Sequence, residues 1–179
     1  TATMSFTVLF LSEGRGFSTG SAALVLAAAQ VLGGGFRGGA GGRSDLLGSR
    51  IVPLRRLALA VTASLVLVGA FARAPGWALV PVLVVAGGIG LSWNGLSFVA
   101  AAELSGPRAS GAALGFQQTM LGIAGIAAPI GIAALVSATS WRTAFVVAGV
   151  FPLLGWAVFR PLAHGPSTGG RPPGELGDA

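Results

Sequence analysis

The sequence predicts an all-α membrane protein with six transmembrane helices, and its composition and patterning carry that prediction. Of its 179 residues, 53% are hydrophobic and 9% are charged, and the mean hydropathy is +0.81. An ordinary soluble domain carries about 25% charged residues. Charges and turn formers gather in short breaks between long apolar runs. Because one membrane-crossing helix needs about 20 apolar residues, six would leave only short connections. We therefore expect a lipid bilayer around most of the chain.

Each break joins turn-forming residues to a charge, which divides the chain into six apolar segments. The first, residues 1 to 12, opens inside an apolar run without a basic leader, and we expect it to be the remainder of a longer helix. The other five segments are residues 19 to 36, 54 to 72, 77 to 102, 111 to 138 and 143 to 159. Residues 1 to 160 thus form the predicted bundle. Residues 161 to 179 contain four prolines and five glycines, and we expect them to form a disordered cytoplasmic tail.

Small and polar residues recur at helical spacing along three segments, which predicts that these helices are central. Helices in lipid associate through close backbone approach and interhelical hydrogen bonds. The longest such seam, predicted to pack against other helices, is Gly111, Gly115, Gln118, Gly122, Gly125 and Pro129. The shorter series are Ala23, Ala27, Gln30 and Gly34, and Gly87, Gly90, Asn94, Ser97 and Ala101. The segments 54 to 72 and 143 to 159 are bulky nearly all round, so we expect them to be peripheral and to face lipid.

The arginine distribution predicts orientation. The chain has 11 basic and five acidic residues, a net charge of +6, and every basic residue is arginine. They are scattered between apolar runs rather than clustered on one face, so we expect no nucleic-acid partner. Cationic connections stay in the cytoplasm. Alternate connections carry eight arginines on one side and three on the other, namely Arg15, Arg73 and Arg142. This predicts a multi-pass protein of the plasma membrane with both ends of the chain cytoplasmic.

The sequence offers no catalytic or metal-binding set. It has no cysteine and one histidine, His164, in the tail. Its acidic residues flank helix ends or lie in the tail rather than deep inside a span. Gly33, Gly35 and Gly38 match G-x-G-x-x-G, but they follow an alanine-rich helix instead of a strand, so a dinucleotide site is not predicted. We expect no metal, no cofactor and no enzymatic activity.

Four residues are candidates for a solute cavity. Asn94 lies near the middle of its span, where an unpaired amide is costly; it either lines a pathway or holds two helices together by a hydrogen bond. Trp93 is its neighbour in mid-helix. Gln117 and Gln118 point about 100° apart, so at most one follows the glycine seam; we assign Gln118 to packing and Gln117 to the cavity. Gln30 is the fourth candidate, although a structural pairing is favoured for it.

Residues 41 to 50, with the sequence GGRSDLLGSR, resemble a loop signature of the major facilitator superfamily, G-x-x-x-D-R-x-G-R-R/K, in its copy between the eighth and ninth helices. The matching positions are Gly41, Asp45, Gly48 and Arg50. Leu46 and Ser49 stand where the family has basic residues. Residues 102 to 115 are similar to the family's connection between the tenth and eleventh helices, although Arg108 precedes Gly111 by three positions rather than one.

The resemblance implies that the chain is the C-terminal six-helix half of a twelve-helix transporter, comprising helices 7 to 12 with the first truncated. Its partners would be the missing N-terminal six-helix half and a small-molecule solute, and its function would be transport of a small organic solute by alternating access. Asp45, with Arg43 and Arg50, would act as a gating latch, the alternative being a simple helix-end cap. Two other functions remain open, a non-transporting membrane scaffold and an inactive truncated half-transporter.

Overall fold

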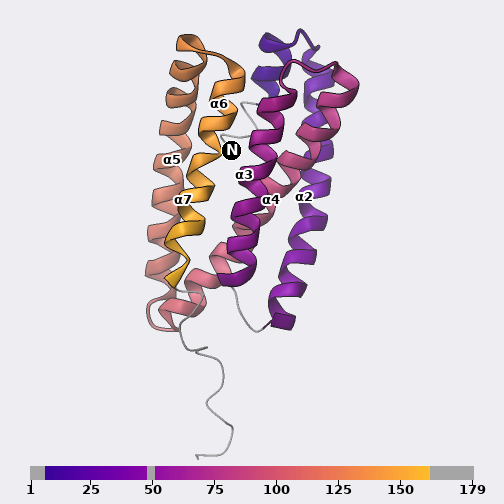
Figure 1. Cartoon of the computed structure of the whole chain (residues 1–179). Coiled ribbons are helices and arrows are strands. Elements are labelled where there is room, and N and C mark those ends of the chain that lie inside the picture. Colours follow the sequence, from indigo (N-terminus) through magenta and orange to yellow (C-terminus); the bar gives the residue numbers. More distant parts are fainter. Residues whose placement is uncertain (1–6, 48–50, 162–179) are drawn as a thin grey trace, which may run out of the picture.

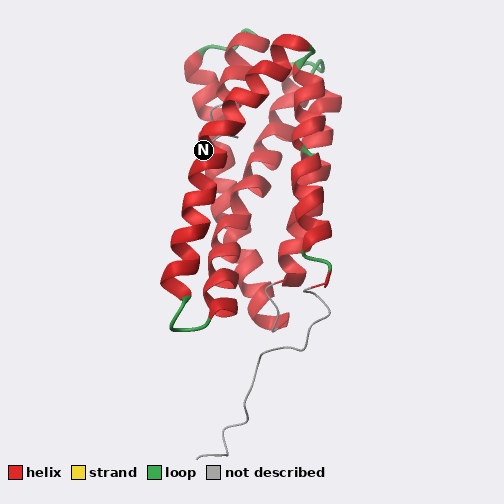
Figure 2. Ribbon diagram, turned by 90° about the vertical axis from the view of Figure 1, so that its left-hand side faces the viewer, coloured by secondary structure: helices red, strands yellow, loops and turns green. Residues whose placement is uncertain are grey.

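The computed structural model describes residues 7–47 and 51–161, and within them it contains helices and no strand (Figure 1). Figure 2 shows the same helices running along one long axis with short loops at the two ends. The elements are a short π-helix η1 (Phe10–Gly14) and the helices α2 (Thr19–Leu47), α3 (Ile51–Phe71), α4 (Gly76–Ser105), α5 (Ser110–Ala138), α6 (Trp141–Ala148) and α7 (Val150–Val158).

Five helical stretches of the described residues are long and apolar enough to cross a membrane. The last combines α6 and α7 into Trp141–Val158. Of the expected first span, residues 7 to 12 are described, and they are helical, first α and then π. The all-α membrane fold is therefore confirmed.

One expected boundary is wrong: α2 does not end at residue 36 but continues to Leu47. The glycine-rich stretch that the sequence marks as a break is helical. Each glycine lowers helix propensity by about 1 kcal/mol, but an unpaired backbone group in hydrocarbon costs several kcal/mol, which keeps the stretch up to Gly39 helical. The apolar, membrane-crossing part of this helix is Thr19–Gly39, and the remaining turns extend past it.

Helix α4 is the centre of the bundle, since it packs against α2, α3 and α5. The closest approach is to α2, where a Cβ atom added to Gly33 would lie 3.1 Å from the carbonyl oxygen of Gly88. One added to Gly87 would lie 2.9 Å from the Cβ of Ala29. Small residues thus join these helices as expected. The buried face of α2, however, is displaced by about one residue from the predicted series and consists of Ala22, Val25, Ala29 and Gly33.

The main apolar core lies near one end of the bundle, where η1, α2, α3, α4 and α6 converge. Phe10 is its centre and is 1% exposed. Its ring packs edge-on against Phe145, with centroids 5.1 Å apart, and against Trp141 at 5.2 Å. Such aromatic contacts fix the short η1 segment against the start of α6.

Helix α3 is not peripheral, which corrects the prediction for residues 54 to 72. It packs against α4 on one side and α6 and α7 on the other. A Cβ on Gly69 would lie 3.0 Å from Val146 Cγ2, so one face of this bulky helix is notched to receive α6. The peripheral position predicted for residues 143 to 159 is seen only in α7, which has no buried residue and whose Phe151 is 70% exposed. In α6, Ala144 and Phe145 are buried.

The last span is interrupted at Gly149, between α6 and α7. Pro152 has no N–H with which to bond the carbonyl of Ala148, so the regular ladder fails there. Thr62 on α3 donates its hydroxyl to the carbonyl of Gly149 at 3.1 Å. This contact ties the last span to α3 at the interruption.

Candidate functional site

A chain of polar groups crosses from α4 to α5 between otherwise apolar helices. The Ser97 hydroxyl donates to the backbone carbonyl of Asn94, one turn earlier on α4, at 3.0 Å. The Gln117 Nε2 atom, on α5, donates to Ser97 Oγ at 2.9 Å. Since the single hydroxyl proton of Ser97 is directed at Asn94, Ser97 can only accept from Gln117. The network therefore turns the amide nitrogen of Gln117 toward α4 and its oxygen away.

That oxygen, Gln117 Oε1, is buried and has no hydrogen-bond partner among the residues that the structure describes. An acceptor buried without a donor costs about 1–3 kcal/mol. Such an acceptor can receive a hydrogen bond from a water molecule or from a ligand N–H or O–H. Gln117 is the one of the four candidates with a buried polar atom that lacks a partner among the described residues, and its place in a solute cavity stays a prediction.

Asn94 and Trp93 are both half-buried on α4. Ser97 contacts only the backbone of Asn94, and the Asn94 carboxamide makes no hydrogen bond to any described residue. The alternative in which Asn94 joins two helices by a side-chain hydrogen bond is therefore not seen in this part of the chain. The carboxamide remains available for a ligand, one helical turn from the Ser97 and Gln117 pair.

Gln30 does not join this group. Its side chain is exposed on α2, and it makes no hydrogen bond to any described residue, so the favoured structural pairing is not found there. The cause is the displaced packing face of α2. Because Ala29 and Gly33 face α4, Gln30 is turned away from it.

Two further residues, one within the polar chain and one beside it, are not among the predicted cavity residues. Ser97 follows Asn94 at helical spacing, a signal that assigns both to one face. Arg37 lies beyond the expected end of its span at residue 36, but in the longer α2 its Nη2 donates to the carbonyl of Leu91 on α4 at 3.2 Å. Its aliphatic stem lies over Gly95, where an added Cβ would be 3.3 Å from Arg37 Cδ. The Arg37 side chain therefore contacts α4 at Leu91 and Gly95, which lie three positions before and one position after Asn94.

The glycine seam of α5 is not packed against any helix that the structure describes, so the central position predicted for α5 is not seen within this part of the chain. No residue of α5 is buried, and Gln118 is exposed. Cβ atoms added at the four seam glycines would meet nothing within 4 Å, namely at Gly111, Gly115, Gly122 and Gly125; Pro129 is half-buried. A small-residue pattern indicates close helix approach but does not identify the partner, and the described helices do not supply one.

The residues of the predicted gating loop are divided between helix and undescribed chain. The backbones of Gly41, Arg43 and Asp45 belong to the last turns of α2 rather than to a loop. Gly48 and Arg50 lie outside the described residues. Asp45 is thus in the final turn of a long helix, where the partial negative charge of the helix end disfavours a carboxylate.

Comparison with known proteins identifies relatives for most of the chain. Two proteins of Mycobacterium tuberculosis, from strains CDC 1551 / Oshkosh and ATCC 25618 / H37Rv, are each named an uncharacterized MFS-type transporter, and each is 33% identical to this chain over 153 residues. The match covers 86% of this chain and 34% of each relative, so the chain spans about a third of their length. No protein-family model and no solved structure matches it.

Proposed function

The chain belongs to the MFS-type transporters, and on this premise we propose that it forms one half of a secondary transporter that moves a small organic solute across the plasma membrane by alternating access. The family places it among multi-pass membrane proteins rather than enzymes. In transporters built from two bundles, the substrate site lies near the membrane midplane between them. The polar chain from Asn94 to Gln117 supports a site on this half, because it lies between two long apolar helices, in the part of each that is nearer the α4–α5 connection.

The unsatisfied Gln117 Oε1 is the observation that carries the proposal. An oxygen that lacks a donor favours a solute with a hydroxyl or N–H group. The candidate cavity residues Asn94, Trp93 and Gln117 are uncharged, which favours recognition by hydrogen bonds over recognition of a strongly ionic solute. Arg37 is the one cation that contacts α4 beside them among the described residues.

The missing N-terminal half is proposed as the partner of the exposed small-residue faces. The seam of α5 is open, and so is the face of α2 that carries Ala23, Ala27, Gln30 and Gly34. In water such faces would need no partner, but helices in lipid associate through surfaces of this kind. The relatives' greater length is consistent with a second bundle.

For Asp45 we propose the latch that the loop signature implies, together with Arg43 and Arg50. A carboxylate in the last turn of α2 is disfavoured by its own helix, whereas the positive N-terminal end of another helix stabilises it by about 0.3–1 kcal/mol. Pairing in only one conformation would make Asp45 a switch. Asp45→Asn should change the transport rate while leaving folding intact; a rate equal to that of the parent protein would leave only the helix-end cap.

Both ends of the chain are proposed to be cytoplasmic. The arginine count supports this orientation, and the α4–α5 connection lies at the same end of the bundle as the end of α7 (Figure 1). In the full-length protein with other cysteines removed, a membrane-impermeant thiol reagent applied to intact cells should label Arg73→Cys but not Arg108→Cys. The reverse pattern would invert the proposed topology.

The function is tested by reconstituting the full-length protein in liposomes and measuring flux across a panel of labelled neutral and charged solutes, with and without a proton gradient. A transported solute should show slower flux in Asn94→Ala than in Gln30→Ala, because only Asn94 borders the polar chain. No flux for any solute, with the protein folded and correctly inserted, would favour a scaffold or an inactive half-transporter. Equal effects of the two variants would remove Asn94 from the site.

A further inference from the structure

Arg37 places a positive charge beside the middle of the central helix. Its backbone belongs to the part of α2 that is apolar enough to cross a membrane, Thr19–Gly39. Its stem lies over Gly95, and its Nη2 atom donates to the carbonyl of Leu91 at 3.2 Å. Leu91 lies midway along α4 (Gly76–Ser105). The bonded end of the guanidinium group is therefore roughly 20 Å along the helix from either end of α4.

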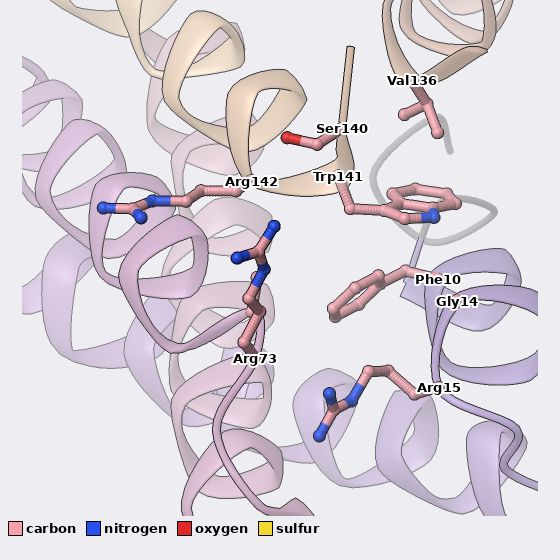
Figure 3. Close-up of a pocket in the computed structure, with 9 residues that line it drawn as sticks. Phe10, Gly14, Arg15, Arg73, Val136, Ser140, Trp141 and Arg142 are labelled. Atoms are coloured by element: carbon pink, nitrogen blue, oxygen red, sulfur yellow. The ribbon is translucent and has the colours of Figure 1, made fainter.

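The arginines at the end of the bundle opposite the end of α7 are placed differently (Figure 3). Arg15, Arg73 and Arg142 line an open pocket of about 410 Å³, and their guanidinium groups point in different directions. They lie in or beside the connections between helices, where side chains reach the water outside the membrane. Lipid cannot solvate a charge at the depth of Arg37, so that charge needs a partner or a water-filled space.

The described part of the chain does not supply that partner. Arginine has five N–H donors, and the bond to the carbonyl of Leu91 uses one of them. The Arg37 side chain is exposed and forms no ion pair with any described residue. The acidic side chains that the structure describes, Glu13 and Glu103, lie near the ends of their helices. The remaining donors of Arg37 are thus available to an anion that enters from outside this bundle.

Around α4, Asn94 lies between the side that Arg37 contacts and the side that bonds α5. Because successive helical residues are about 100° apart, Gly95 is about 100° from Asn94 in one direction and Ser97 is about 60° away in the other. Gly95 lies under the arginine stem, and Ser97 is bonded to α5. A Cβ atom at Gly90, one turn before Asn94, would meet nothing within 4 Å. This face of α4 is open at Gly90, with a cation on one side and the polar chain on the other.

We propose that Arg37 binds a carboxylate group of the transported solute, an inference that rests on the proposed function and names the charge of its solute. Guanidinium donors match the paired oxygens of a carboxylate. The Asn94 carboxamide and the Gln117 oxygen also lack partners among the described residues. A solute with several polar groups can satisfy all three residues, whereas one acidic side chain from a second bundle would satisfy Arg37 alone. The solute is thus a monocarboxylate that also carries a hydroxyl or N–H group.

The test uses the full-length protein and pairs of solutes, each a carboxylate and its uncharged amide: lactate with lactamide, nicotinate with nicotinamide, and N-acetylglycine with its amide. Binding is measured in detergent as the rise of the thermal unfolding midpoint at constant ionic strength, and flux is measured in liposomes. The site variants are Arg37→Gln and Arg37→Lys. The matched control is Arg108→Gln, which removes the same charge from an exposed residue of the α4–α5 connection.

At least one carboxylate should bind more tightly than its amide to the parent protein and to Arg108→Gln. Arg37→Gln should lower the apparent affinity for that carboxylate about tenfold and leave the affinity for the amide within about twofold. Arg37→Lys keeps the charge without the paired donors, so it should lose less; it carries the test if Arg37→Gln does not fold.

The two measurements separate this site from the proposed function. Carboxylate binding that depends on Arg37 without any flux would support the site and contradict transport. Flux of amides with no carboxylate bound would overturn the site and leave transport standing. Equal losses of carboxylate and amide binding in Arg37→Gln would also overturn it, because they would indicate that Arg37 pairs with an acidic side chain of the second bundle. Binding of no carboxylate would overturn the site whatever the flux.

Discussion

The backbones of Gly33 and Gly88 touch where α2 crosses α4. A Cβ atom on Gly33 would lie 3.1 Å from the carbonyl oxygen of Gly88, and one on Gly88 would lie 3.3 Å from the amide nitrogen of Gly33. Neither backbone can retreat without separating the helices. This crossing sets the rotation of α2, and it thereby directs Arg37 toward α4 and Gln30 away from it.

Gly33→Ala should destabilise the protein. The added methyl group would lie 3.0 Å from Leu91 Cβ as well as against the Gly88 carbonyl, and overpacking of this kind costs about 1–3 kcal/mol. The thermal midpoint of the full-length protein in detergent measures the effect. Gly155→Ala is the matched control, because its Cβ would meet nothing within 4 Å. Equal midpoints for the two variants would contradict the close crossing.

Thr62→Val should loosen the last span. The substitution keeps the side-chain shape but removes the hydroxyl that donates to the Gly149 carbonyl. Interhelical hydrogen bonds in membranes contribute about 0.6 kcal/mol on average and up to about 2 kcal/mol. Thr62→Ser keeps the donor and should retain more of the stability. If the valine variant unfolds at or above the temperature of the serine variant, the hydroxyl contact has no stabilising role.

Gly122→Leu should destabilise the full-length protein if the seam of α5 meets a second bundle. Within the described chain the added side chain has open space, so any loss of thermal stability would come from a partner outside it. Gly155→Leu on lipid-facing α7 is the control and should be tolerated. A tolerated Gly122→Leu would indicate that lipid, rather than another helix, covers this seam.

The sequence predicts the spans well and their neighbours less well. Hydropathy and the charged, turn-forming breaks between apolar segments locate the helices, because the bilayer requires each span to be apolar and about 20 residues long. The end of α2 differs from the expected one because a glycine-rich stretch marks a break in water, whereas the glycines up to Gly39 lie in the membrane-crossing part of the helix, where they are tolerated. The peripheral position predicted for α3 is wrong, and the partner of the α5 seam stays a prediction, because residue size indicates how closely a helix can be approached but not by which helix.

The candidate site was also only partly predictable. Gln117 was selected by its angle to the glycine seam, and the structure places it against Ser97. Arg37 was missed because its role depends on the continuation of α2 past residue 36.

The central claim is that Gln117 borders a water-accessible solute path, and thiol labelling tests it most directly. The chain contains no cysteine, so single cysteines can be introduced into the full-length protein after removal of any others. Hydrophilic thiol reagents require a thiolate, which forms in water but not in hydrocarbon. Gln117→Cys should react, and a transported solute should slow the reaction, whereas Phe151→Cys on α7 should stay inert. Exposed Arg108→Cys serves as the labelling control in the same membranes after they are made permeable. If this control is labelled and Gln117→Cys is as unreactive as Phe151→Cys, the claim is contradicted.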